Sequence, residues 1–185
     1  MINDILKEAQ IRMHATIQNL QEDLATIRTG RASPALVEKL PVDYYGTMTP
    51  LVQLASISVP EPRQLLIKPF DPATLRNIEK AILASDLGLT PNNDGKQIRL
   101  NLPALTEERR RELVRVVHAR LEDARVAIRN VRRDLHNDLR DFEREKMISK
   151  DDLERGEEEL QKVTDKYIEE VNKIGQHKEQ EIMEI

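Results

Sequence analysis

Proline is confined to one central segment of this 185-residue chain. All 9 prolines lie between Pro34 and Pro103, and both flanks are free of proline. A helix interior excludes proline, because its ring removes a backbone donor and clashes with the preceding turn. Residues 1–29 and 106–185 can therefore form long helices, whereas the middle is predicted to be a turn-rich domain of another kind.

Apolar residues in both flanks recur with the period of an α-helix. The first stripe advances by about 3.6 residues per step, which favours a straight bundle over a supercoiled pair. We expect three helices to close their stripes on one another as an elongated, antiparallel three-helix bundle. The stripes run from Ile2 to Ile27, from Leu113 to Phe142, and from Leu153 to Ile185, with Gly156 and Lys178 as weak positions in the last.

Capping signals place the ends of the second and third helices. Thr106 precedes two glutamates, which suit the positive end of a helix. Ser149 and Asp152 have the spacing of a capping box, so a short break at 147–149 is expected before the last helix. A helix over 106–147 would be about 60 Å long.

The central segment is predicted to be mixed α/β. Short β-branched or alternating stretches bounded by turn residues indicate strands at 37–45, 56–59, 65–70 and 97–102, with a turn at 92–95. A helix begins with Asp71 as N-cap and Pro72 in its first turn, and it ends before Gly88. Its expected apolar face is Leu75, Ile78, Ile82 and Leu83.

These elements predict an α+β chain of two domains. Residues 1–30 and 105–185 form the bundle, and a small domain of residues 31–104 is inserted at one of its ends. Two chain crossings join the domains and are predicted to act as a hinge, because relative motion is the default across small interfaces. The hinge residues are Thr29, Gly30, Arg31, Pro103, Ala104 and Leu105.

Composition excludes several classes of site. Without cysteine the chain has no disulfide framework, zinc ribbon or iron–sulfur site, and the 4 histidines lack metal-ligand spacing. No phosphate-binding glycine loop occurs, and the acidic run 157–159 is typical of a solvated helix face. We therefore expect no enzyme activity, no cofactor, no metal and no small-molecule substrate.

The chain also lacks the signals of export and membrane insertion. No stretch approaches the ~18 apolar residues of a membrane span, and the N-terminus has no basic leader. A cytoplasmic protein without membrane contact is expected. Because the three apolar stripes can close on one another, a monomer is expected too.

Charge is unevenly distributed behind the net charge of -4. The stretch from Arg125 to Arg133 holds four arginines and no acid. Guanidinium groups suit phosphate oxygens, so this stretch favours polyanion binding. The absence of interleaved aromatic residues favours contact with the backbone of folded nucleic acid over base stacking. On a helical wheel one side carries Arg111, Arg115, His118, Arg125, Arg129 and Arg133, with Arg132 at its edge towards the core.

The alternative is a surface helix whose arginines pair with the acidic last helix. We favour this alternative for Arg120 and Arg140, which have acids nearby in sequence. A helical interaction scaffold without RNA contact, whose bundle binds partner helices, is the competing function. A small-molecule enzyme is a more distant third.

Several segments of the chain are similar to a known family, in the family's order and over the whole length. They are 27–34 (IRTGRASP), 44–47 (YYGT), 49–51 (TPL), 53–56 (QLAS), 84–89 (ASDLGL), 105–110 (LTEERR) and 124–134 (ARVAIRNVRRD). Together they resemble the ribosome recycling factor family.

The resemblance implies an L-shaped protein, a three-helix bundle and a smaller α/β domain joined by a flexible elbow. It implies a translation factor that acts after termination with elongation factor G and that factor's GTP hydrolysis. Docking on large-subunit ribosomal RNA of the 23S type would promote subunit splitting and release of messenger and transfer RNA. By this resemblance Arg110, Arg129 and Arg132 meet the RNA, with Arg28, Arg31 and Arg133 as supporting contacts.

Overall fold

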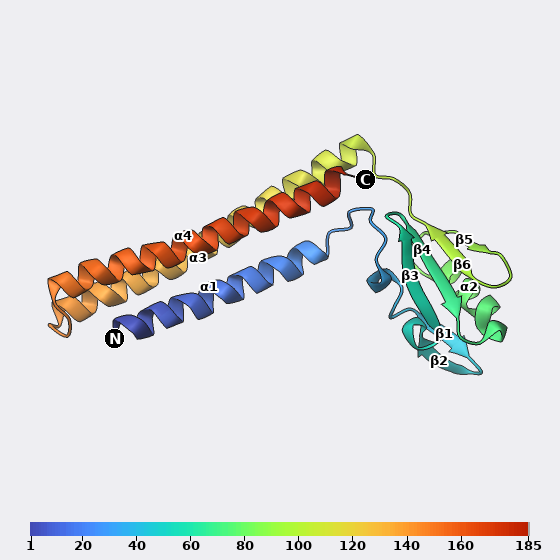
Figure 1. The fold of residues 1–185 in the computed structure, drawn as a ribbon, viewed down its shortest axis with the longest axis horizontal. Coiled ribbons are helices and arrows are strands. Elements are labelled where there is room, and N and C mark those ends of the chain that lie inside the picture. The colour runs from blue at the N-terminus through green and yellow to red at the C-terminus, as the bar shows by residue number, and fades with distance from the viewer. Residues whose placement is uncertain (185) are drawn as a thin grey trace. The chain divides into compact units, whose positions relative to one another are not determined.

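The computed structural model describes residues 1–184, which divide into two compact units (Figure 1). One unit comprises Met1–Arg28 and Glu107–Glu184, and the other comprises Thr29–Thr106. Ile185, the last member predicted for the third stripe, lies outside the described residues.

The first unit is a bundle of three long helices, α1 (Ile2–Ala25), α3 (Glu107–Arg144) and α4 (Lys150–Met183) (Figure 1). Each helix packs against the other two. Gly156 lies beside Leu139, and Gly175 lies beside Leu121. Because the higher-numbered residue of α4 meets the lower-numbered residue of α3, these two helices are antiparallel. The predicted three-helix bundle is confirmed.

The predicted stripes form most of the core of the bundle, with corrections at the stripe ends and within α4. On α4 the predicted members Val163 and Ile174 are only half-buried, and the residue after each is buried instead. From Leu113 to Leu139 every predicted member on α3 is buried, and Phe142 is half-buried. Helix α1 ends at Ala25 instead of residue 29, so Ile27 lies beyond the helix. The hydroxyl of Thr26 donates to the Asp23 carbonyl at 2.6 Å, an interaction that competes with continuation of the helix.

The break between α3 and α4 is built as the sequence predicted. Lys146 has a φ of +58°, and the amide of Met147 donates to the Phe142 carbonyl. Ser149 Oγ accepts from the Asp152 amide at 3.0 Å, and the Asp152 carboxylate accepts from the Ser149 amide at 3.3 Å. Hydrogen bonding of the Asp152 carboxylate to the Ser149 side chain, and then to the Ser149 amide, holds the pKa of Asp152 below its ordinary value. The predicted capping box is confirmed.

Two buried glycines bring α4 close to α3. A Cβ at Gly156 would lie 3.3 Å from Leu139 Cδ2, and a Cβ at Gly175 would clash with Leu121 Cδ1. Gly156 is therefore a buried member of the stripe, not a weak one as predicted. Sequence periodicity missed Gly175, because a residue without a side chain contributes nothing to an apolar stripe.

The second unit contains an antiparallel four-stranded sheet of order β3-β4-β6-β5 and a two-stranded hairpin. Ile67 on β4 pairs with Ile57 on one side and Ile98 on the other, which places it at the sheet's centre. Ile78 and Ile82 of helix α2 join the same core. The bounds are β1 (Pro41–Tyr44), β2 (Thr47–Pro50), β3 (Ala55–Glu61), β4 (Gln64–Pro69), α2 (Leu75–Ala84), β5 (Pro91–Asn93) and β6 (Ile98–Asn101).

The mixed α/β prediction is confirmed for this unit, with local errors. Residues 37–40 are not a strand, because the amides of Val37 and Glu38 bond back to the Pro34 carbonyl. Strands β2 and β5 were missed, since neither has an alternating apolar pattern. The predicted turn at 92–95 begins two residues later, after β5. Leu83 is 61% exposed instead of buried.

The close approach at Gly175 generates a stability prediction. Although alanine has a helix propensity about 1 kcal/mol better than glycine, the clash with Leu121 outweighs it. Gly175→Ala is expected to lower the free energy of unfolding by about 1–3 kcal/mol in denaturant titrations. Gly156→Ala is the matched control. Its Cβ would lie 3.3 Å from Leu139 Cδ2, a tight approach that a shift of a few tenths of an ångström relieves, so the variant should stay within about 1 kcal/mol of the native chain. A Gly175→Ala chain as stable as the native one would contradict the close packing.

Candidate nucleic-acid interface

A row of polar pairs crosses the seam between α3 and α4. Histidine–glutamate pairs stand at its two ends, and arginines bound to neutral amides stand between them. From one end to the other the pairs are His118 with Glu179, Arg125 with Asn172, Arg132 with Gln161, and His136 with Glu157. In the middle of the seam, the groups of α4 that bind the two guanidinium groups are therefore uncharged.

Arg132 is half-buried at this seam. Its Nη1 donates to Gln161 Oε1 at 3.0 Å, and Gln161 Nε2 donates to Asp165 Oδ1 at 2.7 Å. The neighbouring Arg133 is exposed and makes no hydrogen bond or ion pair within residues 1–184. The acid that follows, Asp134, is turned to Arg12 of α1 at 3.0 Å. Neither Arg132 nor Arg133 has a carboxylate partner within residues 1–184.

Arg125 and Arg129 share a carboxylate that lies before the acid-free stretch 125–133. Glu122 lies 3.3 Å from Arg125 Nη1 and 2.5 Å from Arg129 Nη2. Residues three and seven positions apart lie on one helical face, so an acid before the run reaches into it. Hydrogen bonds from Arg129 and then Arg125 hold the pKa of Glu122 below its ordinary value. Positive charge is thus partly neutralised here.

The four arginines from 125 to 133 are called the α3 arginine face below: Arg125, Arg129, Arg132 and Arg133. Arg115 is exposed as well, and no partner is found for it among residues 1–184. Nearer the amino end of α3, Arg111 pairs with Glu107 at 2.7 Å and Arg109 with Glu112 at 2.9 Å. The unneutralised charge of α3 is therefore greatest at Arg132 and Arg133.

Arg110 lies apart from the α3 arginine face. It is half-buried, and its Nη1 donates to the Met183 carbonyl at 2.8 Å, while its Nε is buried without a partner in the described range. A cation at the carboxyl end of a helix meets the negative end of the helix dipole. In this structure Arg110 binds the last turn of α4. It is separated from Arg129 by about 29 Å of helix.

The remaining predicted site residues lie near the boundary of the two units. Arg28 is exposed after the end of α1 and makes no ion pair within residues 1–184, whereas Arg31 is exposed in the second unit. Gly30 has a φ of +79°, and a Cβ there would lie 3.2 Å from Leu105 Cγ. Residues 30 and 105, one from each predicted crossing, are thus neighbours in the second unit.

The pairing with the acidic last helix that was predicted for Arg120 and Arg140 is found for Arg140 and is wrong for Arg120. Arg140 Nε lies 3.7 Å from Glu157 of the acidic last helix. Arg120 pairs instead with Asp23 of α1, at 3.0 Å. Sequence reasoning missed Gln161 and Asn172 as partners of the α3 arginine face. These partners could have been found by aligning α3 and α4 in antiparallel register, which places amides opposite Arg125 and Arg132.

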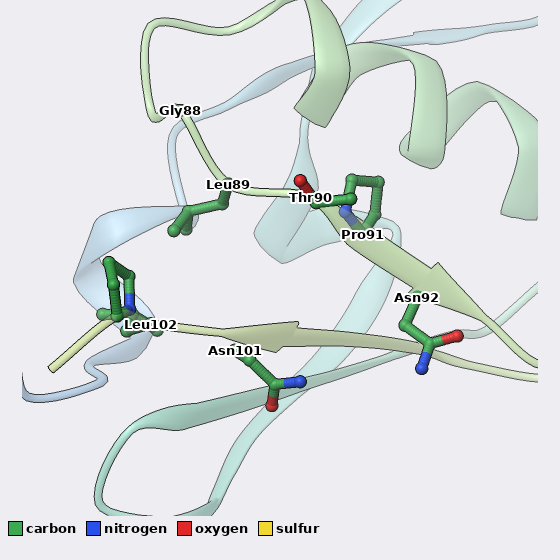
Figure 2. Close-up of a pocket in the computed structure, with 8 residues that line it drawn as sticks. Gly88, Leu89, Thr90, Pro91, Asn92, Asn101 and Leu102 are labelled. Carbon is green, nitrogen blue, oxygen red and sulfur yellow. The ribbon is translucent and has the colours of Figure 1, made fainter.

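Other features of the described residues give no sign of a reaction site. A pocket of about 660 Å³ lies beside β5 and β6, where the loop after α2 meets the end of β6 (Figure 2). Its lining includes the amides Asn92 and Asn101 but no acid, histidine or lysine. Within residues 1–184 no group of three or more acids and histidines could hold a metal ion. In the same range no helix is both long and apolar enough to span a membrane.

Comparison with known proteins gives one family. A model described as "Ribosome recycling factor" matches residues 20–183. Ribosome-recycling factors of Roseiflexus castenholzii and Carboxydothermus hydrogenoformans are each 56% identical to this chain, over its whole length and theirs.

Solved structures agree with the sequence comparison. A solution structure of a ribosome recycling factor is 47% identical, covers 100% of this chain and 98% of its own, and superposes with a TM-score of 0.72. A second, 43% identical over 99% of both chains with a TM-score of 0.63, is described as models for the T. thermophilus ribosome recycling factor and the E. coli elongation factor G bound to the E. coli post-termination complex. Helical bundle, inserted sheet unit and sequence together place the chain in the ribosome recycling factor family.

Proposed function

We propose that this chain disassembles post-termination ribosomes together with elongation factor G, and that it docks on the large subunit through the α3 arginine face. The observation that carries the docking surface is the charge at Arg132 and Arg133. Neither guanidinium has a carboxylate partner within residues 1–184, although the chain as a whole is acidic. A local cationic face is what an acidic protein needs in order to bind a polyanion.

The chemistry of this face favours RNA phosphates. A guanidinium presents a planar fork of donors that matches phosphate oxygens, and it stays charged at any physiological pH. Binding of phosphates releases condensed counterions, so affinity falls steeply as salt rises. The α3 helix fixes the backbone positions of the four arginines along a row about 12 Å long. Ribosomal RNA of the large subunit is the proposed partner.

Elongation factor G is proposed to provide, through its GTP hydrolysis, the free energy that splits the subunits. The T. thermophilus relative is described together with elongation factor G on a post-termination complex, which supports this partner. GTP hydrolysis belongs to the elongation factor, and this chain contributes binding and leverage in the cytoplasm, where it acts as a monomer. Residues 29–31 and 103–105 are the proposed hinge between a docked bundle and the second unit. Splitting of the subunits then releases messenger and transfer RNA.

The proposed contacts differ in weight. The family resemblance implies Arg110, Arg129 and Arg132 as RNA contacts, with Arg28, Arg31 and Arg133 in support. Because Arg133 is exposed and has no partner within residues 1–184, we rank it with Arg129 and Arg132, and we rank Arg110 with the supporting residues. Arg110 is held by the Met183 carbonyl, which fixes its position at the end of the bundle. Its substitution would therefore disturb α4 as well as any RNA contact, and it is a poorer test of docking than Arg132.

Arg132→Ala tests the docking surface. Because the hydrogen bond to Gln161 is exposed and the side chain has no carboxylate partner within residues 1–184, helicity and melting should stay nearly unchanged. Binding to isolated large ribosomal subunits should weaken by on the order of ten-fold or more, and the slope of log affinity against log salt should fall by about one. Filter binding across a salt series measures both. Binding indifferent to salt and to the substitution would instead favour the helical scaffold.

Glu122→Gln tests the same surface in the opposite direction. Removal of this carboxylate leaves Arg125 and Arg129 unneutralised, so binding to large subunits should tighten and its salt slope should steepen. Glu112→Gln, on the same helix but paired with Arg109, is the matched control and should change binding less. If Glu122→Gln weakened binding, the two arginines would not be RNA contacts.

A further inference from the structure

We infer that Gln161 of α4 is a positioning residue for RNA docking: it holds the Arg132 guanidinium in place and leaves its positive charge available to phosphate. The inference rests on the proposed function, since it deepens the role of the α3 arginine face. Asn172, which binds Arg125, acts in the same way one step along the seam.

An amide is the side chain that this position requires. Arginine can only donate hydrogen bonds, and an ionised aspartate can only accept them. Gln161 accepts from Arg132 at 3.0 Å and donates to Asp165 at 2.7 Å, so its two ends satisfy both neighbours. This chain of bonds also sets the orientation of the amide, because the reverse orientation would place donor against donor and acceptor against acceptor.

A carboxylate in place of the amide would neutralise the guanidinium. Glu122 shows this effect on the same helix, where it forms ion pairs with both Arg125 and Arg129. At 161 a glutamate would pair with Arg132 and would also repel Asp165 one turn away. A neutral acceptor instead restrains the guanidinium without removing its charge.

The placement of amides along α4 fits this role. The segment 148–185 is strongly acidic, with 12 acids against 6 basic residues. Glu157 and Glu179 occupy the seam positions opposite the histidines of α3. Opposite the two arginines the same helix carries Gln161 and Asn172. The acidic helix is therefore neutral where it touches the α3 arginine face.

Asn172 makes the more complete contact of the two. Its Oδ1 accepts from both Nε and Nη2 of Arg125, at 3.1 and 2.7 Å. Nη1 of the same guanidinium is left to face Glu122 at 3.3 Å. Arg125 is thus held from two sides and partly neutralised, whereas Arg132 is held only by a neutral group. Gln161 is accordingly the sharper test.

The experiment measures binding of the full chain to isolated large ribosomal subunits over a salt series, for two substitutions of one residue. Gln161→Glu keeps a hydrogen-bond acceptor but neutralises Arg132, so affinity should fall by on the order of ten-fold and the salt slope by about one. Gln161→Met leaves the charge of Arg132 unneutralised but removes the hydrogen bond that restrains the Arg132 side chain. Its affinity should fall about three-fold, as expected from ordering one more long side chain on binding, with an unchanged slope.

Two controls separate positioning from a merely structural role. Gln18→Glu adds the same charge to an exposed site on α1, and it should leave the slope as in the native chain. Both Gln161 substitutions are repeated in an Arg132→Ala background, where their effects on binding should disappear because the group they act through is gone. Asn172→Asp provides the parallel test at Arg125 if Gln161→Glu fails to fold by circular dichroism.

The outcomes distinguish this inference from the proposed function. Loss of binding in Arg132→Ala with native binding in both Gln161 variants would reject the positioning role and leave the docking surface standing. Equal losses from Gln161→Glu with and without Arg132 would also reject it, since the residue would then act independently of Arg132. If Arg132→Ala itself bound as the native chain does, the docking surface would fail and the inference with it.

Discussion

The close packing of α4 on α3 is the constraint on which the rest of the bundle depends. Gly175 and Gly156 remove side-chain bulk where Leu121 and Leu139 press against α4, and this sets the antiparallel register of the two helices. With that register, amides of α4 lie opposite Arg125 and Arg132. Apolar packing inside the bundle therefore determines which polar groups meet at its surface.

On the surface of the bundle, some arginines are neutralised by acids and others keep their positive charge. Most arginines of the bundle pair with acids, as Arg120 does with Asp23 and Arg111 with Glu107. Such exposed pairs contribute little to stability, but they remove the field that would attract a polyanion. Arg132 and Arg133 escape this neutralisation, so a protein with net charge -4 keeps a cationic stretch on one helix.

Sequence reasoning succeeded where a local rule decides the structure. Helical periodicity predicted the core of α3 from Leu113 to Leu139, and the Ser149–Asp152 spacing predicted the break before α4. It failed where partners come from elsewhere in the chain. Glu122 reaches into a run that contains no acid of its own, and Gln161 becomes a partner only through the register of two helices. Strand β5 was missed because its asparagines have no β propensity and pairing with β6 forms it.

The most direct test of the account is a chemical footprint of the arginines, read by mass spectrometry after brief phenylglyoxal treatment. The full chain is labelled free and bound to large ribosomal subunits, with binding verified separately. The account predicts that Arg132 and Arg133 are strongly protected in the complex, while Arg144, paired with Asp141 at the far end of α3, is labelled as in the free chain. Equal labelling of Arg132 and Arg133 in both states would contradict it.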